Sequence, residues 1–549
     1  MLTPIYDHEI PEMTAEIAHG AFPKGNVVMK IRDTLGPIFE DEQFSERYPT
    51  IGQPAASPTR LALVTILQFM EDLTDREAAD AVRSRIDWKY LLGLELNDPG
   101  FHYSVLSEFR LRLLENEAEQ MLLERILEGC QAAGMLKGKK KQRTDSTYVL
   151  ANIRVLNRVE LVGETMRRVL DDIAQVAPEW LKPLIQPEWG KRYGRKVDTH
   201  RIRKSETKKL ELAQAIGEDG RVLLTAIYQE GTPVEVRQLP SVEVLRFVWV
   251  QQYYQIDDEI QWRTKKQQGL PPSRKMIASP DELEARYSSK DGLTWTGYKI
   301  HITETCDEES PRLITHVETT VATTTDGSVT EKIQDDLIEQ GLSPESHWVD
   351  GGYADVDVLL NSQKKGIDLI GPMHQDTSWQ TKVEGGYDQT RFSIDWDNMI
   401  ATCPEGQTSI HWKDGKTASG KPNIHFAFSL PVCKTCAARE RCTRSEKIGR
   451  HLTVPPQKAY EALQTARQRQ ETEDFKELYH RRAGIEGTIG QAANDKGARR
   501  ARYRGLERTH LQHLATAAAI NLERVARWLM GERPEATRIS PFAVLASPI

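Results

Sequence analysis

Three acidic residues stand where a carboxylate can do chemistry. Asp145 lies in the β-prone segment "RTDSTYV", just after a basic run, and Asp350 ends a predicted strand in "SHWVDGGYAD". Glu486 lies in "YHRRAGIEGTIG", on a predicted helix. Carboxylates are hard oxygen ligands of the kind that Mg²⁺ or Mn²⁺ prefers. Such a trio can hold two ions roughly 3.5–4 Å apart for in-line attack at phosphorus.

The same acids also have a structural interpretation. Asp350 can cap the helix that follows it, and Glu486 can form a buried i,i+4 pair with Arg482. The two glycines after Asp350 favour the chemical interpretation, because residues without Cβ atoms let a phosphate backbone approach the carboxylate. Asp355 is interpreted as a first-turn charge of the next helix rather than as a ligand.

The predicted helix around Glu486 has a definable apolar face. At 100° per residue this face is formed by Phe475, Leu478, Ile485 and Ile489. Tyr479, Arg482 and Glu486 fall on or beside it, so we expect all three to point inward. An inward carboxylate must be paired or bind a metal ion.

Four cysteines form a second candidate site. Cys403, Cys433, Cys436 and Cys442 have the spacing C-x29-C-x2-C-x5-C. The "CKTC" pair supplies the tight turn that tetrahedral zinc prefers, so we predict a structural Zn²⁺ site that stabilises a loop-rich segment. Four reduced cysteines are the alternative, and His411 or His425 would complete a mixed site.

The composition limits the classes of function. The 549-residue chain has a net charge of −7, which argues against coating nucleic acid by bulk charge. Four basic segments nevertheless occur, at 136–143, 190–209, 263–266 and 497–505. Each alone is typical of a solvated surface. The chain has no apolar run of roughly 18 residues and no secretory signal, so we expect a cytoplasmic protein without a membrane partner.

The periodicity separates helical from mixed regions. Residues 58–130 are predicted to be helical, with a Thr74–Glu77 capping box and a short turn that resembles a helix-turn-helix. A plain bundle used for dimer contacts is the alternative. Residues 295–373 follow the order β-β-α-β-α-β of an α/β domain with a mixed sheet, and Ser328 and Glu331 predict a second capping box.

These motifs, taken in order, resemble a known family. The matching text begins with "SPTRLALVTILQFMEDLTDREAADAVRSRIDWKYLLGLEL" and continues with "TDSTYVLANI", "WTGYKIHITE" and "HWVDGGYAD". It ends with "YHRRAGIEGTIGQAANDKGARRARYRGLERTHLQHLATAAAINLERVARWL". The chain resembles a bacterial insertion-sequence transposase of the DDE class, in the group numbered eleven-eighty-two, over about residues 55–530.

The resemblance implies a fold and a division of the chain. The fold class is α/β, an RNase-H-like mixed-sheet catalytic core with an N-terminal all-helical domain, a helical insertion and a cysteine-rich zinc-binding insertion. The expected parts are an N-terminal arm (1–55), a helical DNA-binding or dimerisation domain (56–136), the first core strand with its basic linker (137–158), a mainly helical insertion (159–290), the RNase-H-like core (291–373), the cysteine-rich insertion (374–455), the C-terminal helical part of the core (456–532) and a tail (533–549).

The resemblance also implies roles for individual residues. Asp145, Asp350 and Glu486 would be the first, second and third catalytic acids. Related transposases carry the third acid in a Tyr-x2-Arg-x3-Glu-x6-Lys pattern, in which this chain has Ala493 at the lysine position and Lys496 three residues later. The implied DNA contacts are Tyr479, Arg482, Lys496, Arg499, Arg500, Arg502 and Arg504, and the first basic segment adds Lys139, Lys140 and Lys141.

The predicted function is therefore transposition of an insertion sequence. The protein would bind the terminal inverted repeats, cleave at the element ends with Mg²⁺ or Mn²⁺, and join the 3′-hydroxyls to target DNA. Such enzymes pair two ends, so we expect a homodimer on double-stranded DNA, associated with a bacterial nucleoid. A catalytically retired, transposase-derived DNA-binding protein is the alternative, and a hydrolase of small phosphate esters is a third hypothesis that the basic segments disfavour.

Overall fold

Two compact units make up the chain. A computed structural model describes residues 1–6, 9–136, 141–198, 206–257, 259–264, 269–533, 542 and 545, so Lys139 and Lys140 lie outside the described residues. The first unit contains residues 1–137, 145–324 and 486–549, and the second contains residues 138–144 and 325–485. The boundary falls within strand β1 (Lys141–Leu150).

Helices dominate the N-terminal part of the first unit. They are α1 (Glu12–Ala21), α2 (Val27–Leu35), α3 (Pro58–Met70), α4 (Asp75–Ser84), α5 (Ile86–Leu92), α6 (Ser104–Glu115) and α7 (Met121–Ala132). The predicted capping box of α4 is confirmed, because Thr74 Oγ1 accepts from the Glu77 N–H and the Glu77 carboxylate accepts from the Thr74 N–H. Nearly every residue of α3 is buried, so this helix forms the centre of the bundle.

A helical insertion with its own core follows β1. It contains α8 (Arg158–Val176), α9 (Pro178–Leu181), α10 (Trp189–Tyr193), α11 (Glu206–Ile227), α12 (Val234–Arg237), α13 (Pro240–Gln252) and the hairpin of β2 (Tyr253–Ile256) with β3 (Glu259–Trp262). One cluster of buried side chains, from Leu161 to Ile277, connects these elements. The insertion therefore packs around side chains of its own.

Strand β1 contributes residues to both units. In the first unit β4 (Arg286–Lys290), β5 (Leu293–Thr305) and β6 (Ile314–Val321) pair antiparallel, and β1 lies beside β5. In the second unit the first residues of β1 pair parallel with β7 (Ser346–Trp348), which pairs parallel with β8 (Asp368–Ile370). The strand pairing is thus mixed.

Two helices alternate with the short parallel strands of the second unit. They are α14 (Gly327–Glu339) and α15 (Val356–Lys364). The capping box predicted for Ser328 and Glu331 is wrong, because α14 already begins at Gly327 after Asp326. Ser328 Oγ instead donates to the Thr325 carbonyl. Ser328 and Glu331 therefore lie within the first turns of α14 and not at its N-cap.

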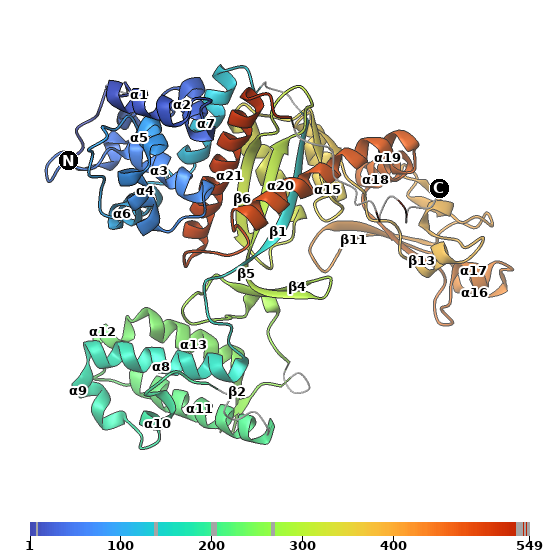
Figure 1. The fold of residues 1–549 in the computed structure, drawn as a ribbon. Coiled ribbons are helices and arrows are strands. Elements are labelled where there is room, and N and C mark those ends of the chain that lie inside the picture. Colours follow the sequence, from blue (N-terminus) through green and yellow to red (C-terminus); the bar gives the residue numbers. More distant parts are fainter. Residues whose placement is uncertain are drawn as a thin grey trace. The chain divides into compact units, whose positions relative to one another are not determined.

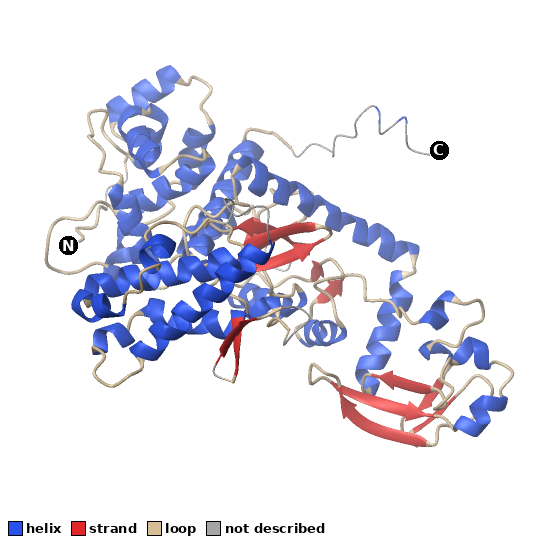
Figure 2. Cartoon of the chain, turned by 90° about the horizontal axis from the view of Figure 1, so that it is seen from below, coloured by secondary structure: helices blue, strands red, loops and turns tan. Residues whose placement is uncertain are grey.

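The cysteine-rich part of the second unit contains small sheets and short helices. Its elements are β9 (Ser393–Asp395), β10 (Ile400–Thr402), β11 (His411–Lys416), β12 (Pro422–Ala427), α16 (Leu430–Thr435), α17 (Arg439–Cys442) and β13 (His451–Val454). Figure 2 shows these strands as a group with short helices beside them. Buried aromatic residues, among them Phe392, Phe426 and Phe428, form a local core.

The last helices lead from the second unit back to the first. They are α18 (Gln457–Gln470), α19 (Glu473–His480), α20 (Ile485–Gly490) and α21 (Leu506–Leu529), with a 3₁₀ turn at Arg481–Gly484 and a π-helical turn at Gln491–Asp495. In the first unit α21 packs against α3, α7 and β6 (Figure 1). None of the helices built from the described residues combines the length and apolar character needed to cross a bilayer.

Candidate functional site

Two of the three predicted acids lie on or directly after strands. Asp145 is on β1, partly buried, and its Oδ1 accepts from the Ser146 N–H at 2.7 Å. Asp350 follows β7, is partly buried, and its Oδ1 accepts from the Gly352 N–H at 2.8 Å. Asp350 therefore closes a tight turn instead of capping the following helix.

That turn leaves little space for a side chain at Gly352. A Cβ atom on Gly352 would lie 3.0 Å from Asp350 Oδ1 and 3.3 Å from Asp326 Oδ2. The structure thus brings a second carboxylate, Asp326, to the same glycine, and no sequence pattern singled this residue out. The glycine next to Asp350 keeps side-chain atoms away from both carboxylates.

Asp355 is the N-cap of α15. Its side chain accepts from the N–H groups of Asp357 and Val358 and pairs with Lys421 at 3.0 Å. Burial opposes ionisation, but the Val358 N–H and the Lys421 ammonium lower the pKa of Asp355 below its ordinary value. The capping role considered for Asp350 therefore belongs to Asp355, which is a cap and not only a first-turn charge.

The segment that carries Glu486 is not one regular helix. The 3₁₀ turn between α19 and α20 has about three residues per turn, so the 100° count loses its phase there. Glu486 is exposed, whereas Tyr479 and Arg482 are half-buried. The expected inward orientation is therefore wrong for Glu486.

Tyr479 and Arg482 lie together, as their spacing on one side of the segment predicts. The Tyr479 ring stacks on Phe475 at a centroid distance of 5.8 Å. The Arg482 guanidinium lies 5.8 Å from the Tyr479 ring centroid. An arginine held against an aromatic ring is suited to hold a phosphate.

Arg143 on β1 connects two of these segments within the second unit. It is paired in the parallel register with Trp348 of β7. Its Nη1 donates to the Arg481 carbonyl at 2.7 Å, and a Cβ atom on Gly484 would lie 2.1 Å from that nitrogen. One buried arginine thus lies against both the end of β7 and the 3₁₀ turn.

Lys496 does not have the environment of a DNA contact. It is only 6% exposed, and its ammonium pairs with Glu523 at 2.6 Å and donates to the Met70 carbonyl at 2.5 Å. Ala493, at the motif position where relatives carry lysine, is also buried. This correction follows from tertiary packing, since a lysine in a basic sequence normally stays in water.

The four arginines after Lys496 have different environments. Arg502 donates to the Leu73 carbonyl and pairs with Asp72, which connects it to the N-terminal helices. Arg499 donates to Thr147 Oγ1 at 3.0 Å and lies over the Tyr148 ring. Arg500 and Arg504 are exposed. The contact predicted for Arg502 is therefore occupied by protein groups, and the two exposed side chains are the stronger candidates.

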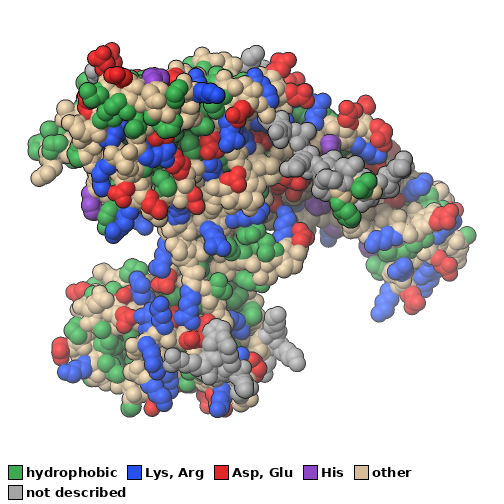
Figure 3. Space-filling view, viewed as in Figure 1, with side chains coloured by type: hydrophobic (Ala, Val, Ile, Leu, Met, Phe, Trp, Pro, Cys, Tyr) green, Lys and Arg blue, Asp and Glu red, His purple; other side chains and the backbone are tan. Residues whose placement is uncertain are grey.

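The side of the molecule drawn in Figure 3 shows no single basic patch among the described residues. On the side drawn in Figure 3, lysine and arginine are interspersed with aspartate and glutamate. Lys141, which opens β1, is partly buried. Any contact to a phosphate backbone must therefore come from local groups of side chains.

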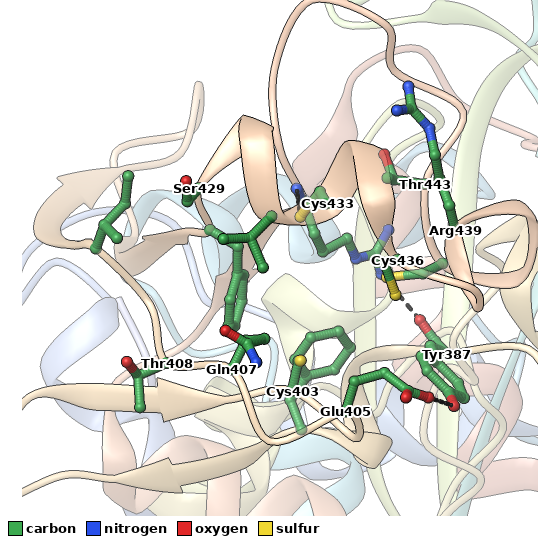
Figure 4. Close-up of a pocket in the computed structure, with 16 residues that line it drawn as sticks. Tyr387, Cys403, Glu405, Gln407, Thr408, Ser429, Cys433, Cys436, Arg439 and Thr443 are labelled. Carbon is green, nitrogen blue, oxygen red and sulfur yellow. Dashed lines mark hydrogen bonds between the residues drawn. The ribbon is translucent and has the colours of Figure 1, made fainter.

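The four predicted zinc ligands line one pocket of about 200 Å³. Cys403 follows β10 and lies across the pocket from Cys433 and Cys436 (Figure 4), and Cys442 ends α17. The rest of the wall includes Phe392 and Phe428. The fold thus brings together thiols that are 30 residues apart in the chain.

The four thiols do not form a closed tetrahedral arrangement. Among the described residues, no three of these sulfurs lie within 4.8 Å of one another. Tetrahedral zinc, with Zn–S bonds of about 2.3 Å, needs sulfurs about 3.8 Å apart. Burial, together with the neighbouring thiols, raises the pKa of Cys442 to about 11. The four thiols are nevertheless the type of donor set that fits zinc.

Comparisons with known proteins identify two parts of the chain. A family model described as "Transposase DDE domain" matches residues 402–526, which include Glu486 and the four cysteines. A model described as "Transposase domain (DUF772)" matches residues 16–112, the N-terminal helices. No curated protein and no solved structure matches the chain.

The two matches and the architecture agree. Mixed strand pairing with a helical N-terminal region is consistent with an RNase-H-like DDE fold. DDE transposases act on DNA and generally use divalent metal ions. The two family-model matches together support a DDE-class insertion-sequence transposase.

Proposed function

We propose that the protein binds the terminal inverted repeats of its element, cleaves at the ends and joins the 3′-hydroxyls to target DNA. The observation that carries this proposal is the position of Arg143. Arg143 is paired with Trp348 and lies against Gly484. Each predicted acid is two residues further along its own segment: Asp145 after Arg143, Asp350 after Trp348, and Glu486 after Gly484. The equal offset of each acid from a residue that Arg143 pairs with or contacts supports the assignment of the three acids to one catalytic set.

Asp145, Asp350 and Glu486 would hold Mg²⁺ or Mn²⁺. When bound, two such ions activate the attacking water or 3′-hydroxyl and stabilise the leaving oxygen of an in-line displacement. The chain contributes orientation: the tight turn after Asp350 keeps its carboxylate fixed, and the glycines beside it admit a phosphate backbone. Exposure of Glu486 suits a ligand that completes its coordination only with metal and DNA.

DNA contacts would come from a few local groups. Arg482, supported by Tyr479, would hold a phosphate near the cut site, and Arg500 and Arg504 would contact the backbone. Arg499 and Lys141 would contribute from the two ends of β1. Pairing two ends requires two active sites, so the active assembly would be a homodimer. Phosphate contacts make binding dependent on salt.

The test is metal-dependent cleavage of a DNA that carries the element ends. Wild-type protein with Mg²⁺ is expected to cleave, and Asp350→Ala is expected to lose cleavage while it still binds the ends. The matched control is Asp357→Asn, which removes an exposed acid from α15 in the same unit and should leave cleavage unchanged. Full activity in Asp350→Ala overturns the catalytic assignment. Binding without cleavage by the wild type would instead identify a retired DNA-binding protein.

We also propose that the cysteine pocket binds one structural Zn²⁺. The support is the convergence of the four thiols on one apolar pocket. Metal analysis of purified protein should give about one zinc per chain. Cys433→Ser should lose that zinc, whereas Cys306→Ser, outside the pocket, should retain it. Equal zinc content in both variants overturns the site.

A further inference from the structure

The helix that carries Glu486, α20, depends on contacts with other elements for its position. It contains six residues, too few to be stable alone, and lies between a 3₁₀ turn and a π-helical turn. Thr488 and Ile489 are buried, whereas Glu486 and Gly487 are exposed. The direction of the Glu486 carboxylate therefore depends on what fixes the opposite, buried side of α20.

A buried carboxylate on the sheet contacts that buried side. Thr488 Oγ1 donates to Glu304 Oε2 at 2.5 Å, and the Glu304 side chain is fully buried on β5. A buried carboxylate requires a positive partner and full hydrogen bonding. Glu304 therefore holds Thr488, and with it the buried side of α20, in place within the first unit.

Arg524 of α21 supplies the positive charge and connects further elements. Its guanidinium pairs with Glu304 at 2.8 Å and donates to Thr488 Oγ1 at 2.6 Å. It also donates to Gln491 Oε1 at 3.0 Å and to the Arg312 carbonyl at 2.6 Å. A single guanidinium thus joins β5, α20, the π-helical turn and α21.

The same chain of contacts continues to the N-terminal helices. Gln491 contacts Glu523, and Glu523 pairs with Lys496, which donates to the Met70 carbonyl at the end of α3. A π-helical turn often marks a functional position, and here it places Gln491 between the two ion pairs. These contacts form the α20 clamp: Glu304, Thr488, Arg524, Gln491, Glu523 and Lys496.

We propose that Thr488, Glu304 and Arg524 are positioning residues that orient Glu486 for metal binding. This inference rests on the proposed catalytic role of Glu486. The clamp holds the buried side of α20, and a shift of that side would displace the carboxylate on the exposed side. Displacement of a catalytic group by about 1 Å can cost about a hundredfold in rate. Lys496 then acts through structure and not through DNA.

The test compares Thr488→Val with Thr488→Ser. Valine keeps the shape and removes the hydroxyl, whereas serine keeps the hydroxyl. We expect Thr488→Val to need about tenfold more Mg²⁺ for half-maximal cleavage of element-end DNA, and Thr488→Ser to stay close to wild type. Binding of the same DNA without metal should be unchanged in both, because a positioning role acts at the metal. Arg524→Lys keeps the positive charge but loses the planar set of guanidinium N–H donors. It should therefore also raise the Mg²⁺ concentration needed for half-maximal cleavage.

Each outcome decides between the two proposals. Equal Mg²⁺ requirements for wild type, Thr488→Val and Arg524→Lys, with Glu486→Ala inactive, overturn the positioning role alone. A parallel loss of DNA binding in Thr488→Val also overturns it, since the effect would then be structural. A wild type that does not cleave, or an active Glu486→Ala variant, overturns the catalytic role of Glu486 and the positioning role with it.

Discussion

The α20 clamp and the cysteine pocket differ in how their polar side chains are partnered. In the clamp, each charged group has a protein partner, with distances of 2.5–2.8 Å around Glu304 and Arg524. In the pocket, four thiols line about 200 Å³, and no three of their sulfurs lie within 4.8 Å among the described residues. The first arrangement is complete without a ligand, and the second has the donors of a metal site without its closed geometry.

The difference indicates which region responds to metal. A buried ion pair with full hydrogen bonding is insensitive to added ions, because its charges are already neutralised. Thiols gain stability from metal only after deprotonation, and the raised pKa of Cys442 delays this step until a cation is present. We therefore expect zinc to act on the cysteine-rich part, and mutations of charged groups to act on the clamp.

Arg524→Met should have the largest effect on stability. It leaves the Glu304 carboxylate buried without its charge partner, which typically costs about 3–5 kcal/mol. Native-state hydrogen exchange of α20 and α21 would report the loss. Arg527→Met, on the exposed side of the same helix, is the matched control. A cost of less than about 1 kcal/mol would show that the clamp is not a closed network.

Zinc removal should have the next largest effect, confined to the cysteine-rich part. At free zinc of about one hundred times the dissociation constant, binding contributes about 3 kcal/mol of unfolding free energy. A chelator should therefore increase hydrogen exchange across β9–β13 and leave α21 unchanged. Faster hydrogen exchange in α21 as well, or unchanged hydrogen exchange in β9–β13, would contradict this assignment of the zinc effect.

Acidification should weaken the polar core of α21 by a smaller amount. Complete burial lowers the pKa of His513 to about 4, and the neutral ring accepts from Thr319 Oγ1 and donates to the Ala498 carbonyl. The unfolded chain binds this proton more readily, with a pKa near 6.5, so stability falls as pH decreases from about 6.5 toward 4. At pH 5 the loss is about 2 kcal/mol.

Urea unfolding at pH 7 and pH 5 measures this linkage. His513→Asn should remove most of the pH dependence from the transition that reports on α21, whereas His451→Gln, at an exposed position, should keep it. A His513→Asn variant with the wild-type pH dependence would assign the effect to other groups.

Two glycines near the third acid provide the smallest and most local test. Gly484→Ala should cost about 1 kcal/mol, because a Cβ atom there would displace the Arg143 guanidinium from the Arg481 carbonyl. Gly487→Ala has no atom within 4 Å of the new Cβ and should stabilise α20 by about 0.5–1 kcal/mol. Thermal unfolding of both variants is the measurement, and equal shifts would exclude the packing role of Arg143.

Local patterns were sufficient for several features. The capping box of α4 and the strand that ends before Asp350 both follow from neighbouring residues. Features that depend on helix phase were predicted less well. The inward orientation of Glu486 was wrong, because the 3₁₀ turn resets the phase of the helix. The predicted cap of α14 was wrong, because the helix begins at Gly327, one residue before Ser328.

The sequence by itself determined which residues are candidates for the chemistry: three acids in ordered motifs, a tyrosine and arginine at fixed spacing, and four thiols. Only the tertiary structure decided which lysine and arginine side chains remain available to contact DNA. Lys496 and Arg502 are basic residues in a basic stretch, yet both are bound by protein groups. Lys496 pairs with Glu523 of α21 and donates to the Met70 carbonyl, and Arg502 pairs with Asp72 and donates to the Leu73 carbonyl. It also decided that Glu304 is buried beside α20. The physical reason is that spacing encodes contacts within one element, whereas ion pairs between residues more than 200 positions apart depend on how whole elements pack.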